Sequence, residues 1–545
     1  MSEKRRRFNI TGILPLTTAP ISFIVCYVLT HQTIFSLAIT AFATAFSSLP
    51  LVYRILVKRL PRASIGEDLL FTIIHMYAVS TGKPSRNRIL EIRTLVGDYG
   101  EFQSTLKRFS TLSTNWGYGL VRAIQLLAKN VRNIVFRNFL LRLSEVLRVG
   151  EDPENYLELE ARMHSRLYEY NYSRSLDLSR VLLGLYSSVM SASAFIIITL
   201  AILSMFMGGD TILLLVSIIG SVSITVFFGF VIVFIMPKDW IIPYGSLRPY
   251  YIRRYILITS ASLLASLALF FLAYGIVGLE QSYALLFACL PLFIPGVYAL
   301  IVEDRIKKVS NVIPVFARSF GMTYSVLQNQ LKAIESTLQG ELGPLRRFVE
   351  ELRARISSGI DPKIGWRYAC FSTCNKDFIR LTNILTDTMD VNGSTSRVGV
   401  FLSDHFTVVN NMRVSRLGIA RTFESTIYML HALLVAISSA LMTILKLFSE
   451  YYKAMMEMME TSSEAFTAIV EFPIKFFEID VNTVANFLFA SIIVLAIMNA
   501  VVLKVVFGGL VESFWTHAAT LLTITSVAWV VMEVLSRQLV IPVMV

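Results

Sequence analysis

The hydrophobic residues of this chain gather in long runs without charged side chains, and polar residues fill the segments between them. Each run is roughly 20 to 25 residues long, the length that an α-helix needs to cross about 30 Å of hydrocarbon. The pattern therefore predicts about nine membrane-spanning helices. The predicted spans cover residues 10–29, 34–56, 181–207, 211–236, 255–277, 283–302, 425–447, 484–503 and 518–535.

The first two predicted spans are the least regular of the nine. Pro15, Pro20 and Pro50 weaken their helices, and only a short connection separates the two runs. A re-entrant hairpin is the alternative there, so the count is nine, give or take one pair.

Two long polar segments between the spans have apolar residues at every third or fourth position, which predicts amphipathic helices. In the first segment this spacing runs from Leu120 through Val131 to Ile134, and again from Phe136 to Leu147. In the second segment it runs over 313–327 and 345–356. Neither segment shows the period of two that is typical of strands. The predicted fold class is an all-α polytopic membrane protein with two helical-bundle domains.

The two bundle segments resemble each other. Each follows two spans and leads into a helix that enters the membrane, and a shift of 242 residues places Phe136 on Phe378 and Gly117 on Gly359. We therefore predict a tandem repeat. The predicted parts are 1–57 (N-terminus, spans 1 and 2), 58–178 (cytoplasmic domain I), 179–236 (spans 3 and 4), 237–254 (cytoplasmic loop), 255–302 (spans 5 and 6), 303–424 (cytoplasmic domain II), 425–447 (span 7), 448–483 (acidic external loop) and 484–545 (spans 8 and 9).

Composition and charge agree with this topology. Of 545 residues, 54% are hydrophobic and 16% are charged, against roughly 25% charged in soluble domains. Basic loops stay in the cytoplasm, and the basic N-terminus at residues 4–7 predicts that the N-terminus lies inside and the C-terminus outside the cell membrane. Residues 58–177 and 303–424 each carry a net charge of +5, whereas 448–483 carries −5. That acidic segment is either an external amphipathic helix on the membrane or ordinary interface packing.

The motifs that would indicate an enzyme are incomplete. Residues 80–85 resemble a phosphate-binding loop, but Tyr77 replaces its first glycine and Pro84 stands where a magnesium ligand is required. Asp210 follows two glycines as in intramembrane aspartyl proteases, yet no facing span supplies a second aspartate. Cys370 and Cys374 lie one helical turn apart without a second ligand pair nearby. We expect no catalytic, cofactor or metal site, and no enzyme.

Ionisable residues are nearly absent from the predicted spans, which argues against a solute pathway. Only His431 lies well inside a span, either as a functional residue or with a satisfied interhelical hydrogen bond. Pro291 and Pro295 could break one span, as in transporters. A multi-span secondary transporter of unknown solute is therefore the alternative function.

Basic residues of the two bundles are the candidate partner contacts, because an exposed cation on a helix face can bind an acidic surface. Arg122, Lys129 and Arg132 are expected to share a helix face opposite the apolar stripe. Ordinary surface charge and lipid headgroups are the alternative explanations. The candidate residues are Arg86, Arg88, Lys107, Arg108, Arg122, Lys129, Arg132, Arg346, Arg347, Arg353, Arg355, Lys363 and Arg367.

The segment from Phe136 to Glu160, FRNFLLRLSEVLRVGEDPENYLELE, contains a helix that ends at Gly150, Glu151 and Asp152 and then resumes toward Glu160. Together with the long helix that follows it and the two similar bundle domains, this segment resembles the type II secretion system F domain family. It is most similar to the archaeal branch, the assembly platform proteins of archaella and type IV pili (FlaJ and ArlJ), which are related to PilC, GspF and TadC. Residues 391–394 of the second copy depart from this motif.

The resemblance implies a platform in the cytoplasmic membrane that couples a hexameric secretion ATPase to the insertion of pilin or archaellin subunits during filament assembly. It implies no hydrolytic site in the platform itself, and no nucleic acid is expected as a partner. A homodimer is expected. The resemblance does not distinguish an archaellum from an adhesive or DNA-uptake pilus.

Overall fold

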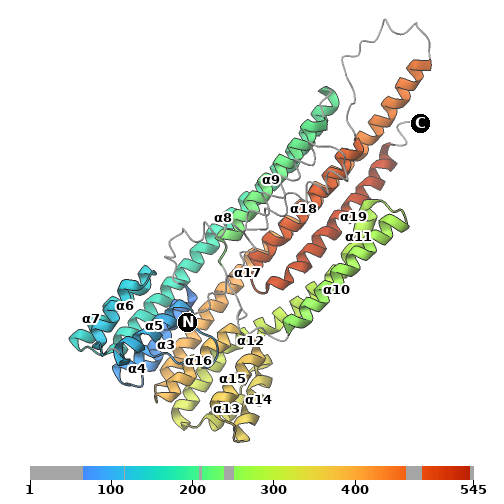
Figure 1. The fold of residues 1–545 in the computed structure, drawn as a ribbon. Coiled ribbons are helices and arrows are strands. Elements are labelled where there is room, and N and C mark those ends of the chain that lie inside the picture. The colour runs from blue at the N-terminus through green and yellow to red at the C-terminus, as the bar shows by residue number, and fades with distance from the viewer. Residues whose placement is uncertain (1–65, 116, 208–210, 238–250, 462–480, 541–545) are drawn as a thin grey trace, which may run out of the picture. The chain divides into compact units, whose positions relative to one another are not determined.

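A computed structural model describes residues 66–115, 117–207, 211–237, 251–461 and 481–540. Every regular element within these ranges is a helix (Figure 1), which confirms the predicted all-α class. Residues 65–132 and 136–545 form one unit, and the contacts discussed below lie within it.

Seven helices or helix pairs in the described ranges are long and apolar enough to cross a membrane. They coincide with the last seven predicted spans, so the polytopic class is confirmed. They are α8 (Pro153–Met207), α9 (Thr211–Ile235), α10 (Tyr251–Phe271), α11 (Gln281–Cys289) with α12 (Phe293–Leu327), α17 (Thr395–Thr461), α18 (Val481–Phe507) and α19 (Phe514–Val540). The two spans predicted within 10–56 and Asp210 lie outside the described residues.

The span that contains Pro291 is interrupted, as proposed from the sequence. A short 3₁₀ turn, Leu290–Leu292, joins α11 to α12. Proline lacks the N–H that would continue the α-helical bonding pattern, which accounts for the tighter turn at this point.

The first bundle consists of α3 (Glu67–Ser80), α4 (Arg86–Leu90), α5 (Glu101–Ser110), α6 (Leu120–Asn130), α7 (Ile134–Val149) and the start of α8. The predicted apolar residues of α7 are buried, and Phe136 packs against Phe102 of α5 with ring centroids 5.1 Å apart. The prediction of one helix through Val131 to Ile134 is wrong. Val131 is extended, and its carbonyl accepts a hydrogen bond from the Arg137 guanidinium at 2.9 Å, which ends α6.

The second bundle contains the end of α12, then α13 (Gln330–Leu338), α14 (Arg346–Ser357), α15 (Pro362–Thr373), α16 (Lys376–Asp390) and the start of α17. Its core includes Phe320 and Trp366, whose ring centroids lie 5.4 Å apart. Asp361 caps α15 by accepting the Lys363 amide at 2.9 Å, and Pro362 takes the first helical position.

Two helices run without interruption from a bundle into a span. α8 has 55 residues and α17 has 67, and the two pack against each other through Tyr172, Leu176, Val409 and Met412. α17 extends past the predicted span end at 447, so residues 448–461, the start of the predicted acidic external segment, are helical. That stretch has no Gly or Pro and is rich in Met and Glu, which favour helix.

The bundles agree in the register of their helices. A shift of 242 residues carries the first residues of α6, α7 and α8 onto the first residues of α15, α16 and α17. It also places Gly150 (φ +87°) on Asn392 (φ +53°), so the segment with a divergent sequence keeps the left-handed backbone. Both residue types tolerate that conformation better than others. This agreement supports the predicted tandem repeat.

Candidate functional site

The largest set of unpaired cations lies on α5, on α6 and in the link that follows α6. Lys107, Arg108, Arg122, Lys129 and Arg132 are all exposed. None of them forms an ion pair with an acidic side chain of the residues that the structure describes, while Arg122 lies 6.0 Å from the Tyr118 ring centroid. Arg132 lies beyond the end of α6, so only Arg122 and Lys129 share the predicted helix face. We call these five residues the basic surface.

The two remaining basic candidates of the first bundle have internal partners. Arg86 donates a hydrogen bond to the Leu147 carbonyl at 3.3 Å. Arg88 is mostly buried and forms an ion pair with Asp387 of α16. Arg88 is therefore part of the contact between the bundles rather than a free surface residue.

The basic candidates of the second bundle are largely neutralised by nearby acids. Arg346 pairs with Glu350 at 2.9 Å, and Lys363 pairs with Asp390 at 2.7 Å. Arg347 and Arg355 both pair with Glu351, at 3.4 and 3.5 Å. Arg353 and Arg367 are exposed, and Arg367 lies over the Phe371 ring. The two bundles thus differ in how much positive charge they leave for a partner.

The residues of the family motif have structural roles. Gly150 takes the left-handed conformation after α7, and Asp152 accepts the Glu154 amide at 3.1 Å, which starts α8. Glu160 receives two hydrogen bonds from the Arg142 guanidinium, at 2.8 and 3.0 Å, and one from the Tyr156 hydroxyl at 2.9 Å. Glu151 is exposed. The motif therefore fixes the angle between α7 and α8.

Helices α3 and α16 join the bundles through a buried ion network. Glu67 pairs with Lys376 at 2.8 Å and with Arg380 at 2.9 Å, and Arg380 also pairs with Asp68 at 2.6 Å. Burial alone raises the pKa of Glu67, but the charges of Arg380 and Lys376 outweigh burial and hold that pKa far below its usual range. The same carboxylates raise the pKa of Arg380 although burial lowers it.

Asp387 is the second connection between the bundles. Its fully buried carboxylate contacts His75 of α3 at 2.9 Å, pairs with Arg88, and accepts the backbone N–H of Arg93 at 3.2 Å. Burial raises its pKa, yet hydrogen bonds and charge from His75 and Arg88 bring the pKa below the ordinary value. Beside it, the Asn383 side chain accepts the amides of residues 95 and 96 and donates to the Val96 carbonyl. A carboxylate and an amide therefore hold the irregular segment of residues 91–96, which follows α4.

Sequence reasoning missed this connection because its partners lie about 300 positions apart. A local signal was His75 within a largely apolar stretch of α3, since a buried polar side chain requires a partner.

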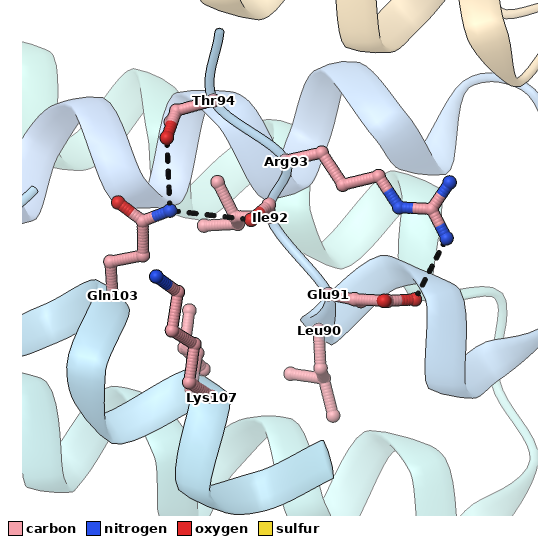
Figure 2. Close-up of a pocket in the computed structure, with 8 residues that line it drawn as sticks. Leu90, Glu91, Ile92, Arg93, Thr94, Gln103 and Lys107 are labelled. Atoms are coloured by element: carbon pink, nitrogen blue, oxygen red, sulfur yellow. Dashed lines mark hydrogen bonds and ion pairs between the residues drawn. The ribbon is translucent and has the colours of Figure 1, made fainter. Parts of the chain in front are cut away.

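Residues 90–94 also form one wall of a cavity of about 390 Å³, and α5 forms the other wall. Figure 2 shows Gln103 and Lys107 reaching from α5 toward residues 90–94. The Gln103 amide donates to the Ile92 carbonyl at 3.4 Å and to the Thr94 hydroxyl at 3.1 Å. Arg93 pairs with Glu91 at 3.3 Å. The lining has no nucleophile beside a base, so it suits a polar contact better than catalysis.

A second buried ion cluster lies where α12, α18 and α19 meet. Glu303 pairs with Lys307 at 2.6 Å and Lys504 at 3.2 Å, and it accepts the Ser513 hydroxyl at 2.9 Å. Gly509, at φ +74°, lies so close that a Cβ there would approach the Glu303 carboxylate to 2.2 Å. Arg416 of α17 donates to the carbonyls of residues 505 and 506. This cluster attaches the second bundle to the last two spans.

His431 has interhelical partners inside the spans. Its Nε2 lies 2.9 Å from the Thr525 hydroxyl of α19, and its Nδ1 lies 3.4 Å from the Asn499 amide of α18. Asn499 also contacts the Tyr186 hydroxyl of α8. Of the two explanations for His431, the satisfied hydrogen bond fits this geometry.

The described part of the chain contains no group of three His, Cys, Asp or Glu residues arranged for a metal ion. Burial raises the pKa of Cys370 to about 12 and that of Cys374 to about 11. Both thiols are therefore protonated at neutral pH when no metal ion is bound.

Comparison with known proteins found two similar chains. The chain is 24% identical to "Flagella accessory protein J" of Methanocaldococcus jannaschii over 463 residues, which cover 82% of this chain and 80% of the relative. It is 22% identical to the protein of the same name from Methanococcus voltae over 524 residues, covering 90% and 91%. No protein-family model matches the chain. No solved structure matches it. The F-domain assignment therefore stays a prediction.

Both alignments extend over most of the bundles and spans described above rather than over one isolated motif. The chain is thus similar to flagella accessory protein J over most of its length.

Proposed function

We propose that this protein is a membrane platform for the assembly of an archaellum or a related type IV filament. The observation that carries the proposal is the similarity to flagella accessory protein J over most of all three chains. In the proposed mechanism, a cytoplasmic hexameric ATPase moves the two bundles, and the spans pass that motion to pilin-like or archaellin subunits in the bilayer. The transporter alternative is not favoured, because neither relative is named as a transporter.

The long helices support this mechanism. α8 and α17 each begin in a bundle and end in a span, and neither contains a proline after its first residue. A helix of that kind lacks an internal proline, which is a common cause of a sharp kink. Motion of a bundle would therefore reach the bilayer as motion of a stiff rod.

The basic surface is the proposed contact for the ATPase. Its five cations have no acidic partner among the described side chains, so an acidic protein surface can bind them without first breaking an ion pair. Lys107 lies at the edge of the cavity in Figure 2, which extends the surface into a recess with Arg93.

The test compares two charge-reversal triples in the full-length protein. Arg122→Glu, Lys129→Glu and Arg132→Glu together reverse three of the five cations of the basic surface. Arg346→Glu, Arg347→Glu and Lys363→Glu are the matched control, because these cations already have acidic neighbours. We expect the first triple to weaken binding of the purified cognate ATPase at least tenfold, and more strongly at low salt. Equal binding by the first triple and the unmodified protein would exclude this surface.

A second test concerns the filament itself. Cells that lack this protein are expected to assemble no filaments visible by electron microscopy, and the unmodified gene should restore them. Normal filaments in the deletion strain would contradict the platform proposal.

The proposal includes the topology predicted from charge, with the N-terminus inside and the C-terminus outside, and a homodimer. The net charge of +5 on each bundle segment supports a cytoplasmic location for both. Single cysteines introduced at exposed Val149 and Ile360 should resist a membrane-impermeant thiol reagent in intact cells and react after permeabilisation.

A further inference from the structure

An apolar stripe lies exposed on the second bundle, along α15 and the turn that precedes it. Ile360 is 40% exposed, Ile364 47%, Tyr368 55% and Phe371 43%. Their spacing of four, four and three residues places them on one face of the helix. The opposite face carries Trp366 and other residues that pack into the bundle core. α15 thus has apolar residues on two faces, and only one of these faces is covered by the residues that the structure describes.

Cations lie over the two aromatic rings of this stripe. The Arg355 guanidinium lies 5.4 Å from the Tyr368 ring centroid, and that of Arg367 lies 5.9 Å from Phe371. Residues 346–373 contain six basic and three acidic side chains, a net charge of +3. A surface that covers the stripe must therefore be apolar at its centre and acidic at its edge.

The first bundle shows that the fold does not require this stripe. With the shift of 242 residues, the four stripe positions correspond to Tyr118, Arg122, Leu126 and Lys129. In that copy two of the four positions, Arg122 and Lys129, are charged and exposed. The bundle thus forms with cations at positions where α15 has Ile364 and Phe371. Exposed apolar patches that the fold does not need are typical of binding sites.

We infer that the α15 stripe is a second docking surface for the ATPase. The stripe binds the ATPase by burying apolar side chains, whereas the basic surface binds it by charge. This inference rests on the proposed function. The occupant follows from two observations. The stripe includes the positions equivalent to Arg122 and Lys129 of the basic surface, and residues 346–373 around it keep a net charge of +3, which fits a partner with acidic side chains. A ring of identical ATPase subunits offers its surface several times, which allows one motor to meet both bundles.

The experiment measures binding of the purified cognate ATPase hexamer to the full-length protein in lipid nanodiscs, between about 50 and 500 mM salt. The stripe variant is Ile364→Asp with Phe371→Asp. The matched control is Val326→Asp, which places an acid on an exposed apolar residue outside the stripe. The conservative variant is Ile364→Val with Phe371→Leu. Because all these residues are exposed, the variants should keep the elution volume and the thermal stability of the unmodified protein.

We expect the stripe variant to weaken binding about tenfold or more at every salt concentration, because the loss of apolar contact does not depend on salt. At low salt, repulsion between the introduced aspartates and the acidic partner should add to this loss. The control and the conservative variant should bind within about twofold of the unmodified protein. The basic-surface triple should instead lose binding mainly at low salt.

Three results would overturn the inference. If the stripe variant binds normally while the basic-surface triple does not, the docking inference is wrong and the proposed function stands. If the unmodified protein does not bind the ATPase at all, the proposed function fails together with the inference. If the stripe variant binds the ATPase normally but changes from dimer to monomer in light scattering, the stripe is covered by a second copy of this chain.

Discussion

The replacement Asp387→Asn tests whether the two bundles move as one body. Asn keeps the shape of the side chain but removes the charge that pairs with Arg88 and the carboxylate that meets His75 and the Arg93 amide. Removing one partner of a buried ion pair costs about 3 to 5 kcal/mol. Because Asn can still accept one hydrogen bond, we expect a loss near the lower value, about 3 kcal/mol.

The assay is hydrogen exchange of the segment held by Asp387 and Asn383. The amides of Arg93, Leu95 and Val96 donate to these two side chains, so they exchange only when the contact between the bundles opens. A loss of about 3 kcal/mol corresponds to roughly a hundredfold faster exchange, at about 1.4 kcal/mol for each factor of ten.

Asp390→Asn is the matched control, since Asp390 lies on the same helix and pairs with Lys363 at a half-exposed position. Surface pairs contribute about 0 to 1 kcal/mol, so exchange should change less than about fivefold in the control. Equal exchange in the two variants would refute the reasoning that Asp387 holds the bundles together.

Two further predictions follow from the buried charges. The pKa values of Glu67 and Asp387 are lower in the folded protein than the usual values of about 4 in an unfolded chain. The stabilisation that these two carboxylates provide is therefore complete above that pH and is lost as the pH falls below it. The urea concentration at the unfolding midpoint should drop between about pH 5 and pH 3, and this drop should be smaller in Asp387→Asn. A midpoint that does not change with pH would contradict the prediction. In Gly509→Ala the new Cβ would clash with the Glu303 carboxylate, and alanine would be strained in the left-handed backbone conformation. We expect a loss of stability of about 2 kcal/mol, seen as a melting temperature in detergent that is several degrees lower. Gly184→Ala, where no atom lies within 4 Å, is the control, and an equal melting temperature in both variants would contradict the prediction.

The spans could be predicted from the sequence because crossing a bilayer imposes a length and an apolar composition that neighbouring helices do not alter. The exposure of Arg122 and Lys129 followed in the same way from the periodicity of α6. In both cases the signal lies within a single helix.

The buried polar face of α16 could not be predicted in this way. Its sequence has the periodicity of a helix with one polar side, yet every residue from Asp377 to Met389 is buried. The polar side is covered by α3 and by the irregular segment of residues 91–96, which both lie about 300 positions earlier in the sequence. For this reason Arg88 was assigned to the surface although its partner is Asp387.

The length of α8 determines how much movement it can produce. At 1.5 Å per residue a 55-residue helix is about 80 Å long, so a tilt of only about 5° displaces its far end by roughly 7 Å. If the ATPase turns the bundles, the stroke felt by a subunit in the bilayer is proportional to helix length, while the required rotation at the motor stays small. In the proposed mechanism the long helices would act as levers, and whole-turn deletions in α8 would shorten the stroke without changing either docking surface.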